Sequence, residues 1–133
     1  MSLKFFTYKE FDCPYLPGSG KVMMKPHFLK FIDTLRGRCK FPFYISSGFR
    51  TKEFNQYLID NPKYKASKTS SHLKGLACDI KIRDSKKRAI FIGCAIELAS
   101  EMDYPVRIGV SKTFCHIDLD TAYNKKSPRI WLY

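Results

Sequence analysis

Hydrophobic residues change their spacing along this chain, from helical repeats to short alternating runs. Between residues 85 and 102 the apolar side chains recur at helical spacing and form one stripe. That stripe predicts an amphipathic helix with one buried face. Two alternating runs, 106–110 and 114–119, follow Pro105 and predict consecutive strands. Strands that follow one another directly favour an antiparallel sheet, so the expected fold class is α+β.

The remaining pattern adds helices and strands earlier in the chain. Pro26 suits a first helical turn and Gly37 a helix stop, while Thr51 can cap a second helix. We expect helices at 26–36, 51–60 and 84–102, and strands at 41–46, 76–82, 106–110 and 114–119. Residues 130–133 form another strand or pack down as an anchored terminus. These elements predict about three helices on one face of a small, mainly antiparallel sheet.

The chain length and its loops point to one domain. The chain has 133 residues, within the usual range of a single domain. Residues 13–20 and 62–71 are rich in turn-forming or polar residues and are expected to be loops. No repeat and no linker divides the sequence, so we expect one domain over residues 1–133.

The net charge of the chain favours polyanionic binding partners but does not choose among them. Lys and Arg number 24 against 12 acidic residues, a formal net charge of +12. Such a charge suits nucleic acid, an anionic membrane face or a bacterial wall. No stretch is apolar for long enough to span a membrane, and no nucleic-acid-binding signature is present, so we expect neither a membrane span nor a nucleic-acid partner.

The cysteines argue against a disulfide framework and against a thiolate metal site. There are five, an odd number, and no two form a Cys-x-x-Cys pair. We expect buried free thiols in a reducing compartment.

Two of the three histidines lie close to acidic residues. His72 precedes a strand that contains Asp79 among apolar neighbours, and a carboxylate in such a strand needs a partner. Farther on, alternation places His116, Asp118 and Asp120 on one face of a strand. The other histidine, His27, lies on the first helix and reads as a surface or capping residue.

Two imidazoles and one carboxylate are a zinc-binding set. Zinc held by His72, Asp79 and His116 would keep a fourth position for water and would lower the pKa of that water toward about 7. A hydrogen-bonded histidine–aspartate pair in the core is the alternative.

Arg50 follows a strand and a Ser-Ser-Gly turn and comes just before a helix. There it could clamp a carboxylate or a polarised carbonyl. Alternatively, Arg50 forms a structural salt bridge with Glu53 or Asp60.

Three segments, in order, resemble the M15 family of zinc peptidases. They are the Ser-Gly-Phe-Arg turn ending at Arg50, the Ser-x-His-x-x-Gly-x-Ala-x-Asp run from Ser70 to Asp79, and the His-x-Asp strand at His116. The family includes D-alanyl-D-alanine carboxypeptidases, dipeptidases and phage endolysins. The resemblance implies the compact α+β fold of the hedgehog amino-terminal domain and zinc held by His72, Asp79 and His116.

The resemblance also implies roles around the metal. Arg50 would contact the substrate or stabilise the transition state, and Ser70 would lie near the substrate. Several branches carry an acidic general base three residues before the last zinc histidine, where this chain has Thr113. Asp118 is the substitute we expect and Asp120 the second choice, although either could instead orient a zinc histidine.

The sequence therefore predicts a monomeric zinc peptidase that hydrolyses D-amino-acid-containing bonds of peptidoglycan stem peptides. The alternative is a non-catalytic, zinc-containing module of the same fold that binds the cell wall. Because no secretory signal is visible, we expect synthesis in a cytoplasm and action on the bacterial wall, with a phage or prophage as a possible source.

Overall fold

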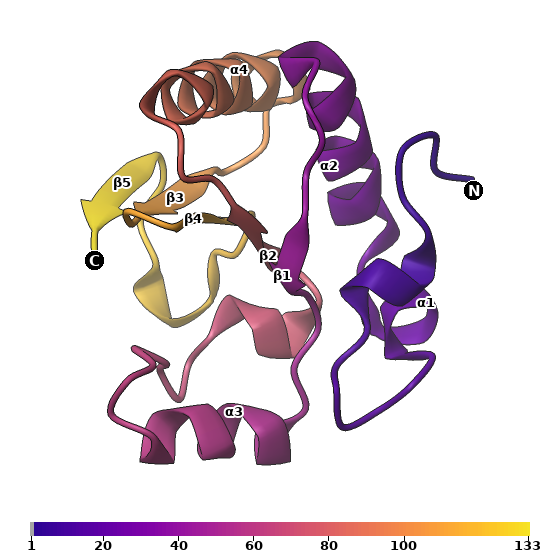
Figure 1. Ribbon diagram of the computed structural model, residues 1–133, viewed down its shortest axis with the longest axis vertical. Coiled ribbons are helices and arrows are strands. Elements are labelled where there is room, and N and C mark those ends of the chain that lie inside the picture. The colour runs from indigo at the N-terminus through magenta and orange to yellow at the C-terminus, as the bar shows by residue number, and fades with distance from the viewer. Residues whose placement is uncertain (1) are drawn as a thin grey trace.

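A five-stranded sheet organises the chain in a computed structural model that describes residues 2–133 (Figure 1). Met1, which the expected domain includes, lies outside the described residues. The strands are β1 (Ile45–Ser47), β2 (Ala77–Lys81), β3 (Arg107–Val110), β4 (Phe114–Asp118) and β5 (Arg129–Leu132), in the spatial order β1-β2-β4-β3-β5.

The sheet is mainly antiparallel, as predicted. β2 and β4 pair antiparallel at its centre, and β1 and β3 extend it antiparallel on either side. Only β5 runs parallel, against β3. The final segment therefore forms a strand rather than a packed irregular terminus.

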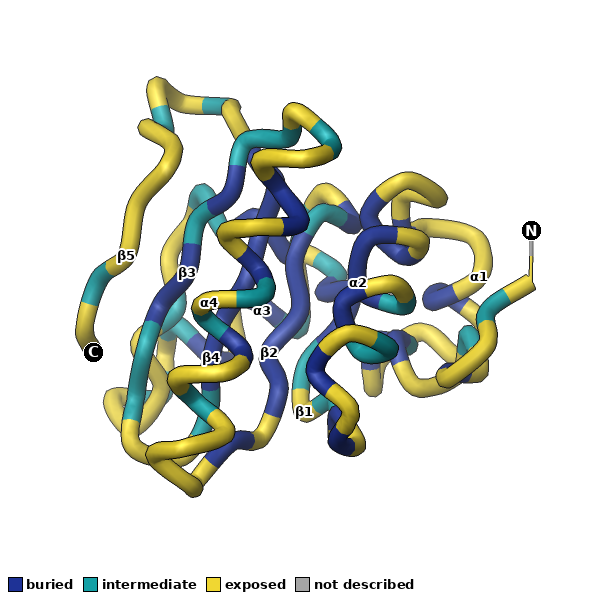
Figure 2. Tube along the Cα trace, turned by 90° about the horizontal axis from the view of Figure 1, so that it is seen from above, coloured by how far each residue is buried: buried dark blue, intermediate teal, exposed yellow. Residues whose placement is uncertain are grey.

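Four α-helices surround the sheet, one more than predicted: α1 (Ser19–Met23), α2 (Pro26–Cys39), α3 (Lys52–Asp60) and α4 (Ser85–Met102). Helices α2 and α4 cover one face, whereas α3 lies on the other side (Figure 1). Seen from above, α4 lies across the central strands (Figure 2). The expectation that all helices share one face is therefore wrong for α3, whose buried residues, Asn55 and Leu58, are not part of the main core.

The core lies between the sheet and the pair α2 and α4. Alternation along β2 and β4 sends one set of side chains into this core and the other set to the opposite face. The residues that fill the core include Phe28, Leu29, Phe31, Ile32 and Leu35 of α2, Phe91, Ala95 and Leu98 of α4, and Cys78, Ile80, Cys115 and Ile117 of the strands. The opposite face of these strands is left free for polar groups.

The ends of several elements differ from the expected ones. Helix α2 continues past Gly37 to Cys39, where Lys40 takes a left-handed conformation with φ 61°. The expected strand at 41–46 is reduced to Ile45–Ser47, because Phe41 and Phe43 pack into the core from irregular backbone. Part of the expected loop at 13–20 belongs to α1. By contrast, α4 begins as predicted, with the Asp84 carboxylate accepting from the Lys87 amide at 3.0 Å.

Three short 3-10 helices complete the chain: η1 (Tyr8–Phe11), η2 (Ser71–Lys74) and η3 (Ala122–Asn124). Within residues 2–133, no helix combines the length and the apolar character needed to cross a membrane.

Candidate metal centre

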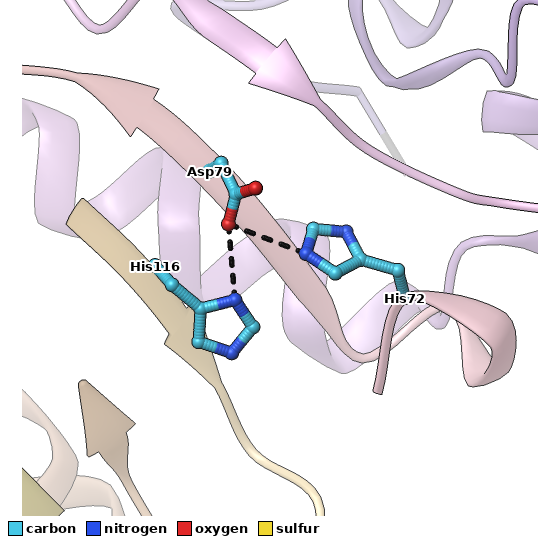
Figure 3. A group of neighbouring side chains, drawn as sticks. All are labelled: His72, Asp79 and His116. Atoms are coloured by element: carbon cyan, nitrogen blue, oxygen red, sulfur yellow. Dashed lines mark hydrogen bonds and ion pairs between the residues drawn. The ribbon is translucent and has the colours of Figure 1, made fainter. Parts of the chain in front are cut away.

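His72, Asp79 and His116 meet at one point on the face of the sheet opposite α2 and α4 (Figure 3). Asp79 Oδ1 lies 3.2 Å from His72 Nε2 and 3.0 Å from His116 Nδ1. The two imidazole rings have centroids 5.2 Å apart. All three side chains are buried. The convergence predicted from the sequence is therefore present.

The strand register and one turn bring these residues together. Asp79 on β2 is directly opposite His116 on β4, so their side chains leave the sheet side by side. His72 arrives on η2, which ends at Gly75 with φ +68°. A Cβ at Gly75 would lie 2.1 Å from the Met23 carbonyl oxygen, so only glycine fits this turn.

Each histidine donates its remaining N–H to an acceptor that fixes its tautomer. His72 Nδ1 donates to the Gly48 carbonyl oxygen at 2.7 Å, and His116 Nε2 donates to Asp118 Oδ2 at 2.6 Å. Neutral imidazole has one N–H and one lone pair. The lone pairs of His72 Nε2 and His116 Nδ1 therefore both face the Asp79 carboxylate. Three electron-rich atoms in such proximity require a proton or a cation between them.

The pKa values of the three groups reflect this requirement in the metal-free site. Burial lowers the pKa of His116, but hydrogen bonds to Asp118 and Asp79 reverse that effect and raise it to about 9. Burial raises the pKa of Asp79, yet the two histidines outweigh it and hold the pKa well below its usual range. His72 has a lowered pKa, mainly because burial disfavours its charged form.

The donor set and spacing fit a divalent metal ion. The three ligand atoms lie within 4.8 Å of one another. Two ligands on a tetrahedral zinc ion, each about 2.0 Å from the metal, are about 3.3 Å apart, close to the distances from Asp79 to each histidine. A carboxylate and a carbonyl oxygen behind the two imidazoles are the support that metal-binding histidines usually have. His72, Asp79 and His116 could therefore hold a metal ion.

Arg50 lies beside this group and is held by three polar neighbours. Its guanidinium donates to Asp79 Oδ2 at 3.3 Å, Ser47 Oγ at 3.0 Å and Asn55 Oδ1 at 3.3 Å. Burial lowers the pKa of Arg50, and the Asp79 charge opposes that effect. The arginine is thus tied to a metal-site carboxylate rather than to Glu53 or Asp60.

The metal-binding group opens into a cleft of about 710 Å³ between the sheet and α3. The predicted site residues that line it are Arg50, Ser70, His72, Asp79, His116 and Asp118. Its walls also include several aromatic side chains, among them Phe54, Tyr57, Trp131 and Tyr133. A peptide-sized ligand could therefore approach His72, Asp79 and His116.

The family profile described as Peptidase M15 matches residues 4–118, most of the chain. The chain belongs to the peptidase M15 family. Its fold is similar to that of the Serratia marcescens L-Ala D-Glu endopeptidase ChiX, with a TM-score of 0.64 at 19% sequence identity. The match covers 78% of this chain and 86% of the ChiX chain. A search of curated proteins finds no significant sequence match. These findings confirm the predicted family and the α+β fold.

In this M15 peptidase the two acidic residues considered as substitute bases are already engaged. Asp118 is fully buried, accepts from His116 and also accepts from Arg107 Nε at 3.1 Å. Asp120 accepts from Ser71 Oγ and from Lys125 Nζ, both at 2.8 Å. Burial alone would raise the pKa of Asp120, but these hydrogen bonds outweigh the effect of burial, and the pKa is lowered.

The other predicted residues of the M15 peptidase are clearly placed. Ser70 Oγ accepts from the His72 amide at 3.2 Å and so caps η2 at the cleft wall. Thr113 is exposed in the turn between β3 and β4 and does not line the cleft. His27 is exposed on α2, with its ring centroid 5.7 Å from that of Tyr104.

Several residues that support or line the candidate site could not be recognised from the sequence. Gly48 contributes only its carbonyl oxygen, so its residue type reveals nothing of the contact. Arg107 reaches Asp118 because β3 and β4 place the two residues opposite each other. Trp131 and Tyr133 enter the cleft through the parallel pairing of β5, which a single short apolar run does not specify.

Proposed function

We propose that this protein is a zinc-dependent peptidase that hydrolyses D-amino-acid-containing bonds in peptidoglycan stem peptides. The observation that carries the proposal is the convergence of two imidazole lone pairs and one carboxylate beside Arg50 in an open cleft. Membership of the M15 family and the fold shared with an enzyme named L-Ala D-Glu endopeptidase support the choice of reaction and substrate.

Each polar residue of the site has a role in this proposal. His72, Asp79 and His116 would hold the zinc ion. Bound zinc supplies a Lewis acid that polarises a carbonyl group and lowers the pKa of coordinated water to about 7. Arg50, fixed by its three neighbours, orients the substrate and stabilises the negative charge that develops on the carbonyl oxygen. Ser70 shapes the cleft wall where the peptide enters.

Asp118 acts in this proposal by orienting His116. The sequence allows a base or an orienting role, and complete burial with bonds to both His116 and Arg107 favours the second. A carboxylate that accepts from a ligand histidine fixes the ring and makes it a better donor to the metal. Asp120 similarly holds Ser71, the residue beside the first ligand, in place.

One observation favours a second candidate, a zinc-containing wall-binding module without catalysis. Among residues 2–133, the acidic residues that line the cleft are Asp79 and Asp118, and both already have cationic or imidazole partners. Thr113 supplies no carboxylate at the position several M15 branches use for the base. A module of this kind would bind the wall but release no product.

The proposal also covers which peptide bond is cleaved and where the protein acts. Both D-Ala-D-Ala and L-Ala-D-Glu bonds are candidate substrates, so the protein would act either as a carboxypeptidase or as an endolysin-type endopeptidase. We propose that it acts on the bacterial wall as a monomer after synthesis in a cytoplasm, as a phage or prophage enzyme would.

Metal analysis and wall digestion test the function together. Freshly purified protein should contain about one zinc ion per chain and release peptides from purified wall sacculi. His72→Ala should lose both zinc and activity, whereas His27→Ala, which changes an exposed histidine outside the cleft, should retain both. Zinc with wall binding but no product from either candidate bond would establish the binding module. Absence of metal from the active protein would overturn both proposals.

A further inference from the structure

Three cationic side chains lie next to the candidate metal centre, and they differ in how many N–H donors remain free. Each nitrogen of Arg50 already donates to one neighbour, Ser47, Asn55 or Asp79, so one N–H remains on each of its two terminal nitrogens. Lys125 Nζ donates to Asp120 Oδ2, to the Thr69 carbonyl oxygen and to Ser71 Oγ at the start of η2. An ammonium group has three donors, so all those of Lys125 are used.

The third cation, Arg107, retains free donors. Its Nε donates to Asp118 at 3.1 Å, while Nη1 and Nη2 have no partner among residues 2–133. The guanidinium lies 5.0 Å from the centroid of the Trp131 ring, and the side chain is 17% exposed in the cleft. Asp118 and Trp131 thus hold the group in one orientation while its terminal nitrogens remain accessible.

The charge of the cleft selects the ligand that such a group would take. Five cationic residues and two acidic ones line the cleft, and both acids already have partners. An excess of positive charge attracts an anion. The planar guanidinium presents two N–H groups in a geometry that matches a carboxylate, with less affinity for a neutral amide.

We propose that Arg107 binds a carboxylate of the substrate peptide and makes the cleft selective for peptides that carry a free carboxylate near the cleaved bond. The inference rests on the proposed function, because it supplies the substrate feature that the cleft would recognise. Arg107 would be a specificity residue: it touches the substrate but not the reacting atoms. Its bond to Asp118 would couple substrate recognition to the orientation of His116.

A pair of peptides tests the inference. Both contain L-alanine linked to the nitrogen of a γ-linked D-glutamyl residue, whose α-carboxylate is free in one peptide and a carboxamide in the other. Trp131 is the single tryptophan of the chain and lies against Arg107, so its fluorescence reports binding. Stopped-flow titration of the zinc-loaded protein gives the affinity for each peptide before turnover. Separate assays give kcat/KM.

We expect wild type to bind the carboxylate peptide roughly tenfold more tightly than the carboxamide peptide. Arg107→Ala should reduce this preference to within about twofold. Arg129→Ala is the matched control, because Arg129 lies opposite Arg107 on β5 but does not line the cleft. It removes the same charge and should retain the preference.

The remaining outcomes are decisive as well. An unchanged preference in Arg107→Ala, or no binding of either peptide by wild type, would overturn the inference. If Arg107→Ala loses its zinc or its fold, Arg107→Lys serves as the test instead. Lysine keeps the positive charge beside Asp118 but lacks the paired N–H donors, so the preference for the carboxylate peptide should fall about threefold or more. Selective binding without hydrolysis would leave the inference standing and refute the proposed function.

Discussion

His72 and His116 are each fixed by the acceptor behind the ring, a carbonyl oxygen in one case and a carboxylate in the other. This difference matters because a carbonyl cannot be exchanged by changing a side chain, whereas Asp118 can. The support behind His116 is therefore the accessible place to test how strongly ring orientation contributes to metal binding.

Asp118→Asn should weaken zinc binding by about 10–100-fold, the usual effect of altering a residue behind a ligand histidine. The amide oxygen can still accept from His116, but the negative charge that faces His116 and Arg107 is lost. Competition with a chelator measures the affinity. Asp60→Asn, at an exposed position on α3, is the control and should bind zinc like wild type. Equal affinities for the two variants would contradict the orienting role.

The pH dependence of metal binding follows from His116. Its pKa of about 9 in the metal-free site means that a proton occupies the ring at neutral pH and must leave when zinc binds. Apparent zinc affinity should rise about tenfold per pH unit up to about pH 9 and then level off. Isothermal titration in buffers of different ionisation enthalpy would count the released proton. A pH-independent affinity between pH 7 and 9 would refute this account.

The same residue makes the metal-free protein less stable at high pH. The folded pKa of His116, about 9, is above the ordinary value of 6.5. Its contribution to the free energy of unfolding is thus fully present below pH 6.5 and disappears as the pH rises through 9. The loss is at most about 3 kcal/mol. Urea unfolding in the presence of a chelator should show the decline, and His116→Gln should remove it.

At the scale of elements, the pairing of β3 with β5 depends on Gly109. A Cβ there would lie 2.7 Å from ring atoms of both Trp131 and Tyr133, so the two aromatic rings occupy the space a side chain would need. Gly109→Ala should destabilise the protein by about 1–3 kcal/mol and shift the tryptophan emission as the ring is displaced.

Gly93→Ala is the control for this substitution, because nothing lies within 4 Å of a Cβ at that exposed position of α4. Alanine favours helix over glycine, so this variant should gain about 0.5–1 kcal/mol. Denaturant unfolding of both variants checks the opposite signs. Destabilisation of similar size in both would mean that the rings do not confine Gly109.

Elements with a strong local signal were predictable, and those that depend on distant pairing were not. Helix α4 and the centre of the sheet follow from hydrophobic spacing, and the convergence of His72, Asp79 and His116 follows from residue type and motif order. Arg107 reaches the cleft only because of the register between β3 and β4. That register depends on packing across the whole sheet, which residue type alone does not encode. The end of α2 was missed since Lys40 adopts a conformation usually left to glycine.

At the scale of the whole molecule, all five cysteines are free thiols, as predicted. Burial raises the pKa of Cys39 to about 12 and that of Cys115 to about 11, and it also raises the pKa of Cys78. A thiol with a raised pKa forms little reactive thiolate. At pH 8 an aromatic disulfide reagent should therefore label half-buried Cys94 first and the others only on unfolding. Cys94→Ser should remove the fast phase, and rapid labelling of all five would contradict the packing.

The two walls of the cleft come from different parts of the architecture. The candidate metal-binding side chains belong to β2, β4 and η2 and form one wall, whereas α3 and the polar segment that follows it form the facing wall. Grafting a different helix and loop in place of residues 52–69, with Asn55 kept as the partner of Arg50, would therefore change the wall that a ligand meets while the candidate metal ligands stay in place. The facing wall could thus be redesigned separately from β2, β3, β4 and η2, where Arg107 and the candidate metal ligands are anchored, which makes the scaffold a practical starting point for redirected hydrolases.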